Sequence, residues 1–247
     1  MRKSYFVWAV LLIAGTLQAA AQTQPPAAPP YKAVAVTLPA AVTDPDFEAL
    51  RKKLGEAAQR KDRAALAALV LAQGFFWDRD NRDGADKRKS GFDNLATALA
   101  LNTKTSAGWE ILFSFTDDPT ASASPAHKTA LCAPGEPGYK RAEFDALVKA
   151  TQTEASDWGY PVSAGIEVRA TPQAGAPVIE KLGLTFIRVS PGNAPASAAF
   201  LRIITPDGKA GFVSVDEIAT TGGDQLCYVK DNGAWKIGGY IGGGEAE

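Results

Sequence analysis

Short apolar runs separated by turn residues fill the last third of the chain, and this pattern restricts the fold more than any other feature of the sequence. Between residues 168 and 213, runs rich in Val, Ile and Phe recur between clusters of Gly, Pro and Asn. Such runs are typical of an all-β unit with tight turns. Asp207-Gly208 separates the runs 201–204 and 212–213, and Asp-Gly readily adopts the positive φ that a hairpin turn needs. The sequence therefore predicts a hairpin here.

A second hairpin is predicted near the C-terminus. Asn232-Gly233 joins the runs 226–230 and 234–237. Asn-Gly between two such runs is the strongest short-range signal for a hairpin. At least two hairpins are therefore expected after residue 200.

Two motifs in this region resemble those of bacterial SH3-like (SH3b) domains. Members of that family commonly begin with Val-Arg-x-x-Pro and end with a Pro-Asp-Gly-Lys-x-Gly-Trp-Val hairpin. This chain has Val-Arg-Ala-Thr-Pro at 168–172 and Pro-Asp-Gly-Lys-Ala-Gly-Phe-Val at 206–213. The resemblance covers roughly the last third of the protein and implies a small barrel that binds ligands or packs on a neighbouring domain. Many relatives have Trp where this chain has Phe200-Leu201 and Phe212, so an apolar residue is kept at both places.

The resemblance also implies a ligand class and candidate ligand contacts. Cell-wall peptide or glycan is the first class that it suggests. Aromatic side chains of the predicted barrel are candidates for lining a groove, and each is also a candidate for the core, because aromatic rings dominate core packing. These four residues are Phe200, Phe212, Tyr228 and Trp235.

The N-terminus, residues 1–21, has the three parts of a secretory signal peptide. Arg2 and Lys3 form a positive n-region, residues 5–14 an apolar h-region, and residues 19–21 a small-residue cleavage site. The apolar stretch is shorter than the roughly 20 residues that a membrane-spanning helix needs, and no second apolar run follows. We therefore expect a periplasmic or secreted protein without a membrane span after cleavage.

Export gives the two cysteines a predicted role. Disulfides persist in oxidising compartments, so Cys132 and Cys227 are expected to form one bridge. In the chain-entropy model a bridge over a loop of this length contributes roughly 4 to 5 kcal/mol to stability. Two separate buried thiols are the alternative that the sequence leaves open.

The rest of the chain divides into a predicted linker and a predicted helical domain. Residues 22–43 are rich in Pro and Ala, a composition typical of a semi-extended linker. Residues 44–157 show helical spacing of apolar residues, beginning at Asp44-Pro45, where an N-cap precedes proline at the first helical position. The predicted fold class is therefore α+β: a mostly helical N-terminal domain followed by a small SH3-like β-barrel with a C-terminal hairpin, residues 158–247.

Parts of the predicted helical domain remain open. The stretch 109–115 fits either a helix or a strand, because periodicity cannot distinguish the two in short apolar runs. The segment from Leu50 to Trp77 is similar to the start of nuclear-transport-factor-2-like domains, which also begin with a helical pair leading to an aromatic segment. The long curved strands of such domains are not evident before Val168, so the helical domain is assigned to no family.

Charge and residue content disfavour several classes of function. The chain has 26 basic and 27 acidic residues, and removal of Arg2 and Lys3 with the signal peptide leaves 24 against 27, a net charge of −3. A nucleic-acid-binding protein needs a basic face, which this balance does not favour. His127 is the only histidine, so a zinc site or a His-containing catalytic triad has few possible members. No cofactor, metal site or catalytic residue is expected.

The leading hypothesis is a non-enzymatic exported envelope protein with an SH3b-like binding or adaptor module, whose partner is peptidoglycan or an envelope protein. One alternative is a cell-wall hydrolase with an N-terminal catalytic region, which an acid-lined cleft between Asp78 and Asp118 would favour. The other alternative is a scaffold whose barrel docks on its own helical domain. A continuous hydrophobic interface between the two domains would favour the scaffold.

Overall fold

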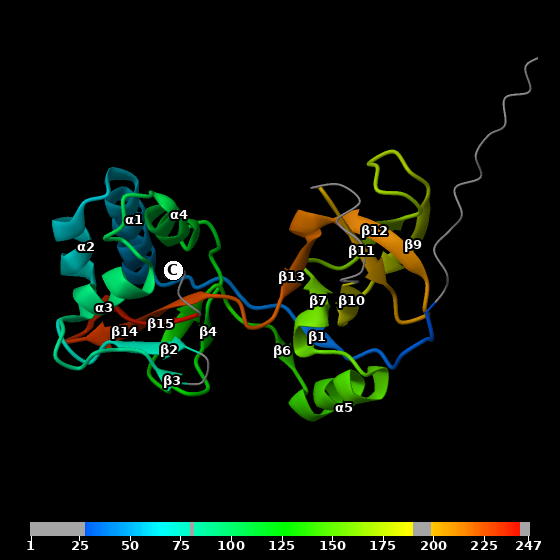
Figure 1. Ribbon diagram of the computed structural model, residues 1–247, viewed down its shortest axis with the longest axis horizontal. Coiled ribbons are helices and arrows are strands. Elements are labelled where there is room, and N and C mark those ends of the chain that lie inside the picture. Colours follow the sequence, from blue (N-terminus) through cyan, green and yellow to red (C-terminus); the bar gives the residue numbers. More distant parts are fainter. Residues whose placement is uncertain (1–27, 80–81, 190–198, 243–247) are drawn as a thin grey trace, which may run out of the picture.

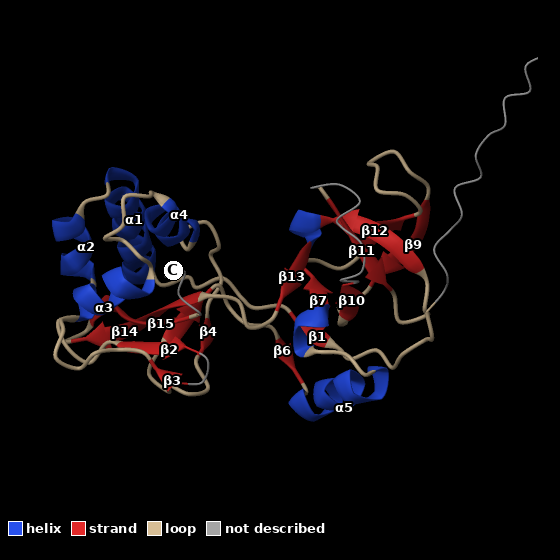
Figure 2. Cartoon of the chain, viewed as in Figure 1, coloured by secondary structure: helices blue, strands red, loops and turns tan. Residues whose placement is uncertain are grey.

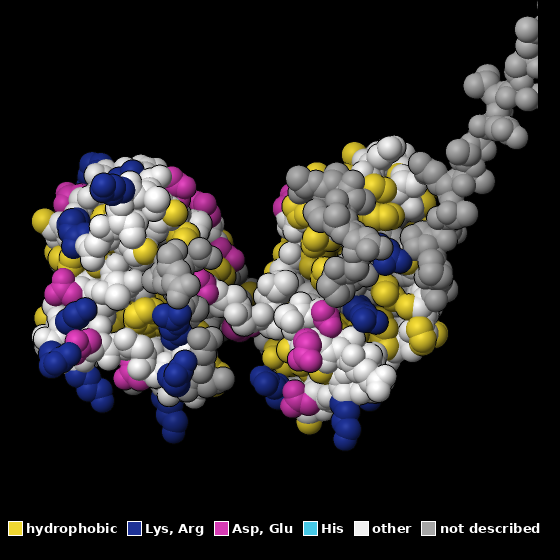
Figure 3. All heavy atoms as spheres, in the orientation of Figure 1, with side chains coloured by type: hydrophobic (Ala, Val, Ile, Leu, Met, Phe, Trp, Pro, Cys, Tyr) yellow, Lys and Arg dark blue, Asp and Glu magenta, His cyan; other side chains and the backbone are white. Residues whose placement is uncertain are grey.

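The computed structural model describes residues 28–79, 82–189 and 199–242, which form two lobes joined by a narrow waist (Figure 1; Figure 3). The predicted signal peptide, residues 1–21, lies outside the described residues. On the face shown in Figure 3, Lys and Arg side chains are mixed with Asp and Glu side chains on both lobes.

Neither lobe is continuous along the chain. We call them the α/β lobe, residues 40–133 and 225–242, and the β lobe, residues 28–38 and 134–224. The chain therefore crosses the waist three times. The β lobe is inserted between two strands of the α/β lobe.

Three of the four helices in the α/β lobe begin at a residue whose side chain caps the helix. Asp44 accepts hydrogen bonds from the backbone N–H groups of Asp46 and Phe47, and Pro45 occupies the first helical position, as predicted. The stretch 109–115, which the sequence leaves open, is helical apart from its last residue. The four helices are α1 (Pro45–Arg60), α2 (Arg63–Leu69), α3 (Gly91–Ala98) and α4 (Ala107–Ser114).

The helices lie on one face of a six-stranded sheet (Figure 2). Neighbouring strands are antiparallel, except β2 and β15, which run parallel. In spatial order the strands are β3 (Arg82–Asp83), β2 (Phe76–Arg79), β15 (Ala234–Ile241), β14 (Gln225–Asp231), β5 (Leu131–Ala133) and β4 (Ser122–Ala123).

An apolar core holds these helices on the sheet. Phe47, Leu54 and Leu66 from α1 and α2 are fully buried, together with Tyr228 of β14. The rings of Phe47 and Tyr228 pack edge to face with centroids 4.9 Å apart. Full burial of a large apolar side chain contributes about 1.5 to 3 kcal/mol to folding stability. The burial of these residues therefore stabilises the packing of the N-terminal helices on the C-terminal hairpin.

The β lobe is built on a seven-stranded antiparallel sheet. Gly208 has φ +79° in the turn between β11 and β12, and Asn232 and Gly233 have φ +49° and +84° in the turn between β14 and β15, so both predicted hairpins are confirmed. In spatial order the β-lobe strands are β13 (Ile218–Thr220), β7 (Trp158–Pro161), β10 (Ile187–Val189), β11 (Phe200–Ile204), β12 (Ala210–Ser214), β8 (Ile166–Arg169) and β9 (Val178–Leu182).

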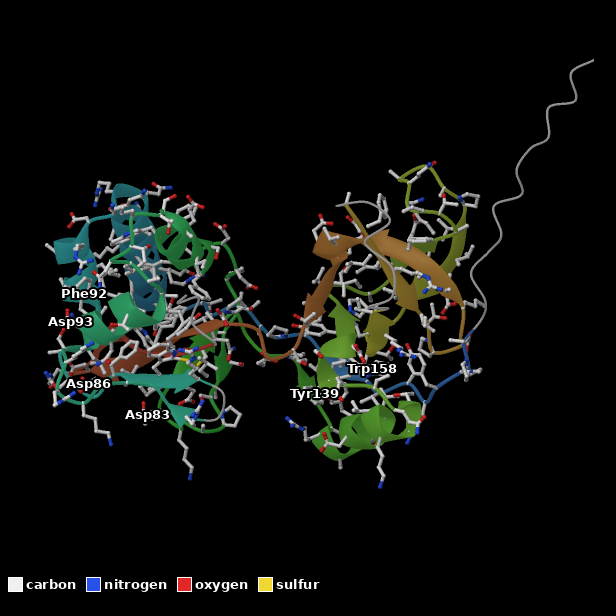
Figure 4. All side chains as sticks on the ribbon, in the orientation of Figure 1. Asp83, Asp86, Phe92, Asp93, Tyr139 and Trp158 are labelled. Carbon is white, nitrogen blue, oxygen red and sulfur yellow. A yellow bond between two sulfur atoms is a disulfide. The ribbon has the colours of Figure 1, made fainter. Side chains whose placement is uncertain are left out.

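The predicted linker contributes to the core of the β lobe, as far as the structure describes it. Strand β1 (Val36–Thr37) pairs with β6 (Gly138–Tyr139), and the carbonyl oxygen of Val34 accepts a 3.0 Å hydrogen bond from Phe186 N–H. Val34 and Val36 are buried in a cluster with Trp158 beside helix α5 (Arg141–Thr151). Figure 4 shows Tyr139 and Trp158 in this region of the β lobe.

The predicted fold class, a mostly helical N-terminal domain followed by a small SH3-like barrel, is wrong. Among the described residues, fifteen strands in three sheets accompany five short α-helices. Strands β2 to β5 have two to four residues each; β2 and β5 pair with β15 and β14 of the C-terminal hairpin, and β3 and β4 extend the sheet beyond β2 and β5. Segments this short carry no detectable period, and their pairing is decided by tertiary contacts. The hairpin assigned to the barrel from sequence therefore completes the sheet of the α/β lobe.

Candidate functional site between the lobes

The four aromatic residues predicted to line a groove are divided between the lobes. Phe200 and Phe212 lie on β11 and β12 of the β lobe, whereas Tyr228 and Trp235 lie on β14 and β15 of the α/β lobe. The structure therefore does not bring the four together in one groove. Tyr228 is fully buried, and among the described residues its hydroxyl group has no hydrogen-bond partner.

Trp235 connects the last hairpin to the start of α1. Its indole Nε1 donates a 2.9 Å hydrogen bond to Oδ2 of Asp44, the N-cap of α1. Its ring packs against Phe47 with centroids 5.2 Å apart, and Lys230 Nζ lies 4.9 Å from the ring centroid. These contacts give Trp235 a structural role.

The predicted disulfide between Cys132 and Cys227 is confirmed. The two residues are direct partners on the adjacent strands β5 and β14, with their Sγ atoms 1.99 Å apart, and both are buried. The chain leaves the α/β lobe after Ala133 and returns at Gln225. The bridge therefore joins the two strands at the base of the inserted β lobe.

A pocket of about 380 Å³ lies where the chain crosses between the lobes. This volume is within the roughly 300 to 1,000 Å³ typical of small-molecule sites. We call it the inter-lobe pocket. It is lined by Leu38, Pro39, Asp118, Thr120, Pro134, Gly135, Glu136, Tyr160, Val162, Ala219, Thr220, Gly223, Asp224 and Gln225.

Three carboxylates line this pocket, and each is held in place through one of its oxygens. Asp118 Oδ1 accepts a 2.7 Å hydrogen bond from Thr120 N–H, and Glu136 Oε1 accepts a 3.0 Å bond from Gly222 N–H. Asp224 Oδ2 accepts a bond from the Tyr240 hydroxyl group. The second oxygen of each carboxylate has no donor within the part of the chain that the structure describes.

Burial and neighbouring charge perturb two titratable groups of the pocket. Burial raises the pKa of the Glu136 carboxyl above its ordinary value, and the hydrogen bond from Gly222 N–H partly opposes this rise. Burial raises the pKa of Tyr160 to about 12, with smaller contributions from the negative charges of Glu136 and Asp118. Perturbed groups that converge in a pocket are a physical indication of a functional site.

Tyr160 has a hydroxyl group without a hydrogen-bond partner among the described residues, and it lines the inter-lobe pocket. Only 6% of the residue is exposed, and it lies on β7 in the wall of the pocket. No described residue donates to or accepts from its hydroxyl group, and this oxygen is not one of the buried unpaired side-chain atoms, so it faces the open space of the pocket. A ligand in the pocket could hydrogen-bond to it in place of water.

Hydrogen bonds between segments hold the pocket walls in position. Gly135 N–H donates to Thr120 Oγ1 over 2.9 Å, and Gln225 Nε2 donates to the Pro134 carbonyl oxygen over 2.6 Å. Arg51 Nη2 of α1 donates to the backbone carbonyl oxygens of Thr116 and Asp118 in the segment that carries Thr120. These hydrogen bonds fix the segments of both lobes that form the walls of the pocket.

Asp78 and Asp118, between which an acid-lined cleft would favour an enzyme, do not line the inter-lobe pocket together. Asp118 lines the inter-lobe pocket, whereas Asp78 Oδ2 lies 2.9 Å from Nε2 of His127. The His127 ring stacks on Phe76 with centroids 3.5 Å apart. The only histidine is therefore held against β2 and is not part of the pocket.

Other acidic residues of the α/β lobe lie on its outer side, away from the waist (Figure 4). Asp83 accepts from Ala85 N–H, Asp86 pairs with Arg88, and Asp93 accepts from the Ser90 hydroxyl group. Across the described ranges, no group of three His, Cys, Asp or Glu side chains is placed to hold a metal ion. In those same ranges, no helix combines the length and the apolar character needed to cross a membrane.

Sequence reasoning missed the inter-lobe pocket because its walls come from separate segments of the chain. Asp118, Glu136, Tyr160 and Asp224 lie on four such segments, brought together where the lobes meet. The turn-rich sequences Pro134-Gly135-Glu136-Pro137 and Gly222-Gly223-Asp224 mark two of the crossings. These two turn-rich sequences were the only signal in the sequence for the places where the chain passes between the lobes.

Comparison of the chain with protein-family models, with curated proteins and with solved structures finds no match.

Proposed function

We propose that this protein is a non-enzymatic exported protein of the bacterial envelope that binds cell-wall peptide or glycan in the inter-lobe pocket. One observation carries the proposal: a pocket of about 380 Å³ formed by both lobes is lined by three carboxylates and by Tyr160, among apolar side chains. A few convergent polar groups in a concave pocket are the usual composition of a ligand site.

The arrangement of the β lobe supports the SH3b resemblance within this proposal. The motif at 206–213 provides the turn and second strand of the β11–β12 hairpin, and the motif at 168–172 begins on β8. Arg169 of the first motif is the register partner of Phe212 of the second. The two ends of the resembling segment therefore lie side by side.

We propose that the protein is periplasmic or secreted. The disulfide between Cys132 and Cys227 fits an oxidising compartment. Residues 1–21 supply the expected signal. Mass spectrometry of the mature protein should place its N-terminus at or near Gln22, and an intact Met1 in a cytoplasmic fraction would contradict export.

The proposed ligand site is tested by filling the pocket. Gly223 lines the pocket, has no positive φ, and a Cβ at this position meets nothing within 4 Å. Gly223→Trp should therefore fold and occupy the pocket. Gly175→Trp is the matched control, because Gly175 has the same freedom but lies between β8 and β9, outside the pocket lining.

The measurement is co-sedimentation of the mature protein with isolated insoluble peptidoglycan. We expect the wild-type protein and Gly175→Trp in the pellet and Gly223→Trp in the supernatant. Equal sedimentation of both variants would show that the pocket is not the binding site. A wild-type protein that stays in the supernatant would contradict wall binding itself.

A cell-wall hydrolase is the second candidate, because the raised pKa of Glu136 is a property of a general acid and two further carboxylates share its pocket. Release of soluble fragments from peptidoglycan, abolished by Glu136→Gln, would support this candidate. The scaffold alternative lacks its distinguishing feature. No hydrophobic cluster of the described residues extends over both lobes.

A further inference from the structure

We infer that the inter-lobe pocket selects a ligand that carries a protonated amino group. This inference rests on the proposed function, in which the pocket is the binding site. It deepens the proposal by choosing a wall peptide with a free amine over an N-acetylated, uncharged glycan.

The charge of the pocket lining carries the first step. Asp118, Glu136 and Asp224 are all acidic, and the described lining residues include no Lys, Arg or His. Arg51 is the cation bonded nearest to this wall, and it donates to backbone carbonyl oxygens rather than to a carboxylate. The negative charge of the pocket is therefore not neutralised by a protein ion pair.

The unused acceptors carry the second step. Each of the three carboxylates has one oxygen occupied by a protein donor and one without a donor in the described part of the chain. An ammonium group has three N–H donors and no acceptor. Its positive charge and its N–H donors therefore suit an unused carboxylate oxygen better than a neutral hydroxyl group does.

The pocket lining favours an organic cation over a metal ion. In the described residues these carboxylates do not converge as a metal-binding group. The pocket of about 380 Å³ also has apolar walls, formed by Leu38, Val162 and Ala219. An alkyl chain that ends in an ammonium group fits both properties.

Tyr160 is a further residue that we expect to contact the amine ligand. Tyr160 lines the same pocket as Glu136 and Asp118. Its hydroxyl oxygen can accept one hydrogen bond from an ammonium N–H of the ligand. Loss of this group should therefore weaken binding less than loss of a carboxylate charge.

Isothermal titration calorimetry on the mature full-length protein tests the inference. The probes are 1,5-diaminopentane and the amide of Nα-acetyl-lysine, with 1,5-pentanediol and N-acetylglucosamine as uncharged comparisons. We expect both amines to bind at least about 10-fold more tightly than the diol, since a charge-assisted hydrogen bond contributes about 1.5 to 3 kcal/mol.

Variants separate recognition from folding. Glu136→Gln keeps an oxygen for Gly222 N–H and should weaken amine binding by about 10-fold or more, and Asp118→Asn is a second variant of the same kind. Tyr160→Phe should weaken it by about 3-fold or more. Glu56→Gln is the control, because Glu56 lies on α1 outside the pocket lining. Thermal unfolding of each variant confirms that it is folded.

Each result bears on one proposal. Amine binding that is equal to diol binding, or that is unchanged in folded Glu136→Gln and Asp118→Asn, overturns the inference. Failure of both amines to bind, while wild-type protein still sediments with peptidoglycan, overturns the inference and leaves wall binding intact. Carboxylate-dependent amine binding without sedimentation supports the inference and contradicts the wall ligand.

Discussion

At the scale of single residues, the position of Glu136 suits ligand binding but lowers the stability of the folded protein at neutral pH. The carboxyl is partly buried in the inter-lobe pocket without a basic partner among the described residues, and burial raises its pKa. A carboxyl whose pKa is higher in the folded state contributes stability below its unfolded pKa. That contribution is lost as the pH rises through the folded pKa. Sites adapted for function often cost stability in this way.

Replacement of Glu136 by Gln should therefore stabilise the protein at neutral pH. The amide oxygen still accepts from Gly222 N–H, and no buried negative charge remains. The measurement is the thermal midpoint of Glu136→Gln and wild type at pH 7 and again below the ordinary Glu pKa of about 4.3. We expect a higher midpoint for the variant at pH 7 and a smaller difference at low pH. A lower midpoint at pH 7 would contradict this account.

Gly208 is a residue whose backbone and surroundings both require glycine. Its φ is +79°, and a Cβ at this position would lie 2.1 Å from the Ala28 carbonyl oxygen. Gly208→Val should therefore destabilise the protein by about 1 kcal/mol or more, because β-branched residues tolerate positive φ poorly.

Chemical denaturation checks this prediction. Gly175→Val is the matched control, since Gly175 has neither a positive φ nor an atom within 4 Å of its Cβ position. An unchanged unfolding midpoint for Gly208→Val would mean that residue 28 and the hairpin turn do not meet as described.

At the scale of elements, the disulfide holds the strands between which the β lobe is inserted. Cys132 and Cys227 are 95 residues apart in sequence and adjacent in the sheet. In the chain-entropy model a loop of this length is worth roughly 4 to 5 kcal/mol. The double variant Cys132→Ser/Cys227→Ser should lose stability of this order in urea unfolding. Equal stability of the wild type and the double variant would show that the bridge does not restrict the unfolded chain.

The same element explains why the disulfide was predictable and the strand pairing was not. The cysteines are the only pair in the chain, so their partners follow from composition. Strand β5 has only three residues, and its identity as a strand depends on its contacts with β14 and β4. The contact with β14 joins residues that are 95 apart in the sequence, so no local pattern specifies it.

At the scale of the whole molecule, the lobes are interleaved and neither is a contiguous segment. The fragment 158–247 contains the hairpin β14–β15 without the helices and strands on which it packs, and it lacks β1 and β6 of the β lobe. We predict that this fragment shows no cooperative unfolding transition, whereas the chain from residue 28 to 247 does. Circular dichroism during thermal unfolding checks both. A sharp transition in the fragment would mean that the lobes are not interdependent.

Local sequence signals determined several parts of this protein by themselves. Asp44-Pro45 marks the start of α1, Asp-Gly and Asn-Gly mark both hairpins, and the two cysteines mark the bridge. Each of these features depends on the conformational preference or the chemistry of residues close together in the chain or unique in it. For this reason these features could be predicted from the sequence without tertiary information.

Tertiary structure alone decided the fold class and the pocket. Strands as short as β2 and β5 gain their hydrogen bonds and burial from β14 and β15, so no local preference specifies them. The pocket joins Glu136, Tyr160 and Asp224 of the β lobe to Asp118 of the α/β lobe, and the raised pKa values of Glu136 and Tyr160 arise mainly from burial in the folded protein. Pairing between distant segments and the desolvation of buried groups are properties of the folded molecule, and neither is present in a stretch of sequence taken alone.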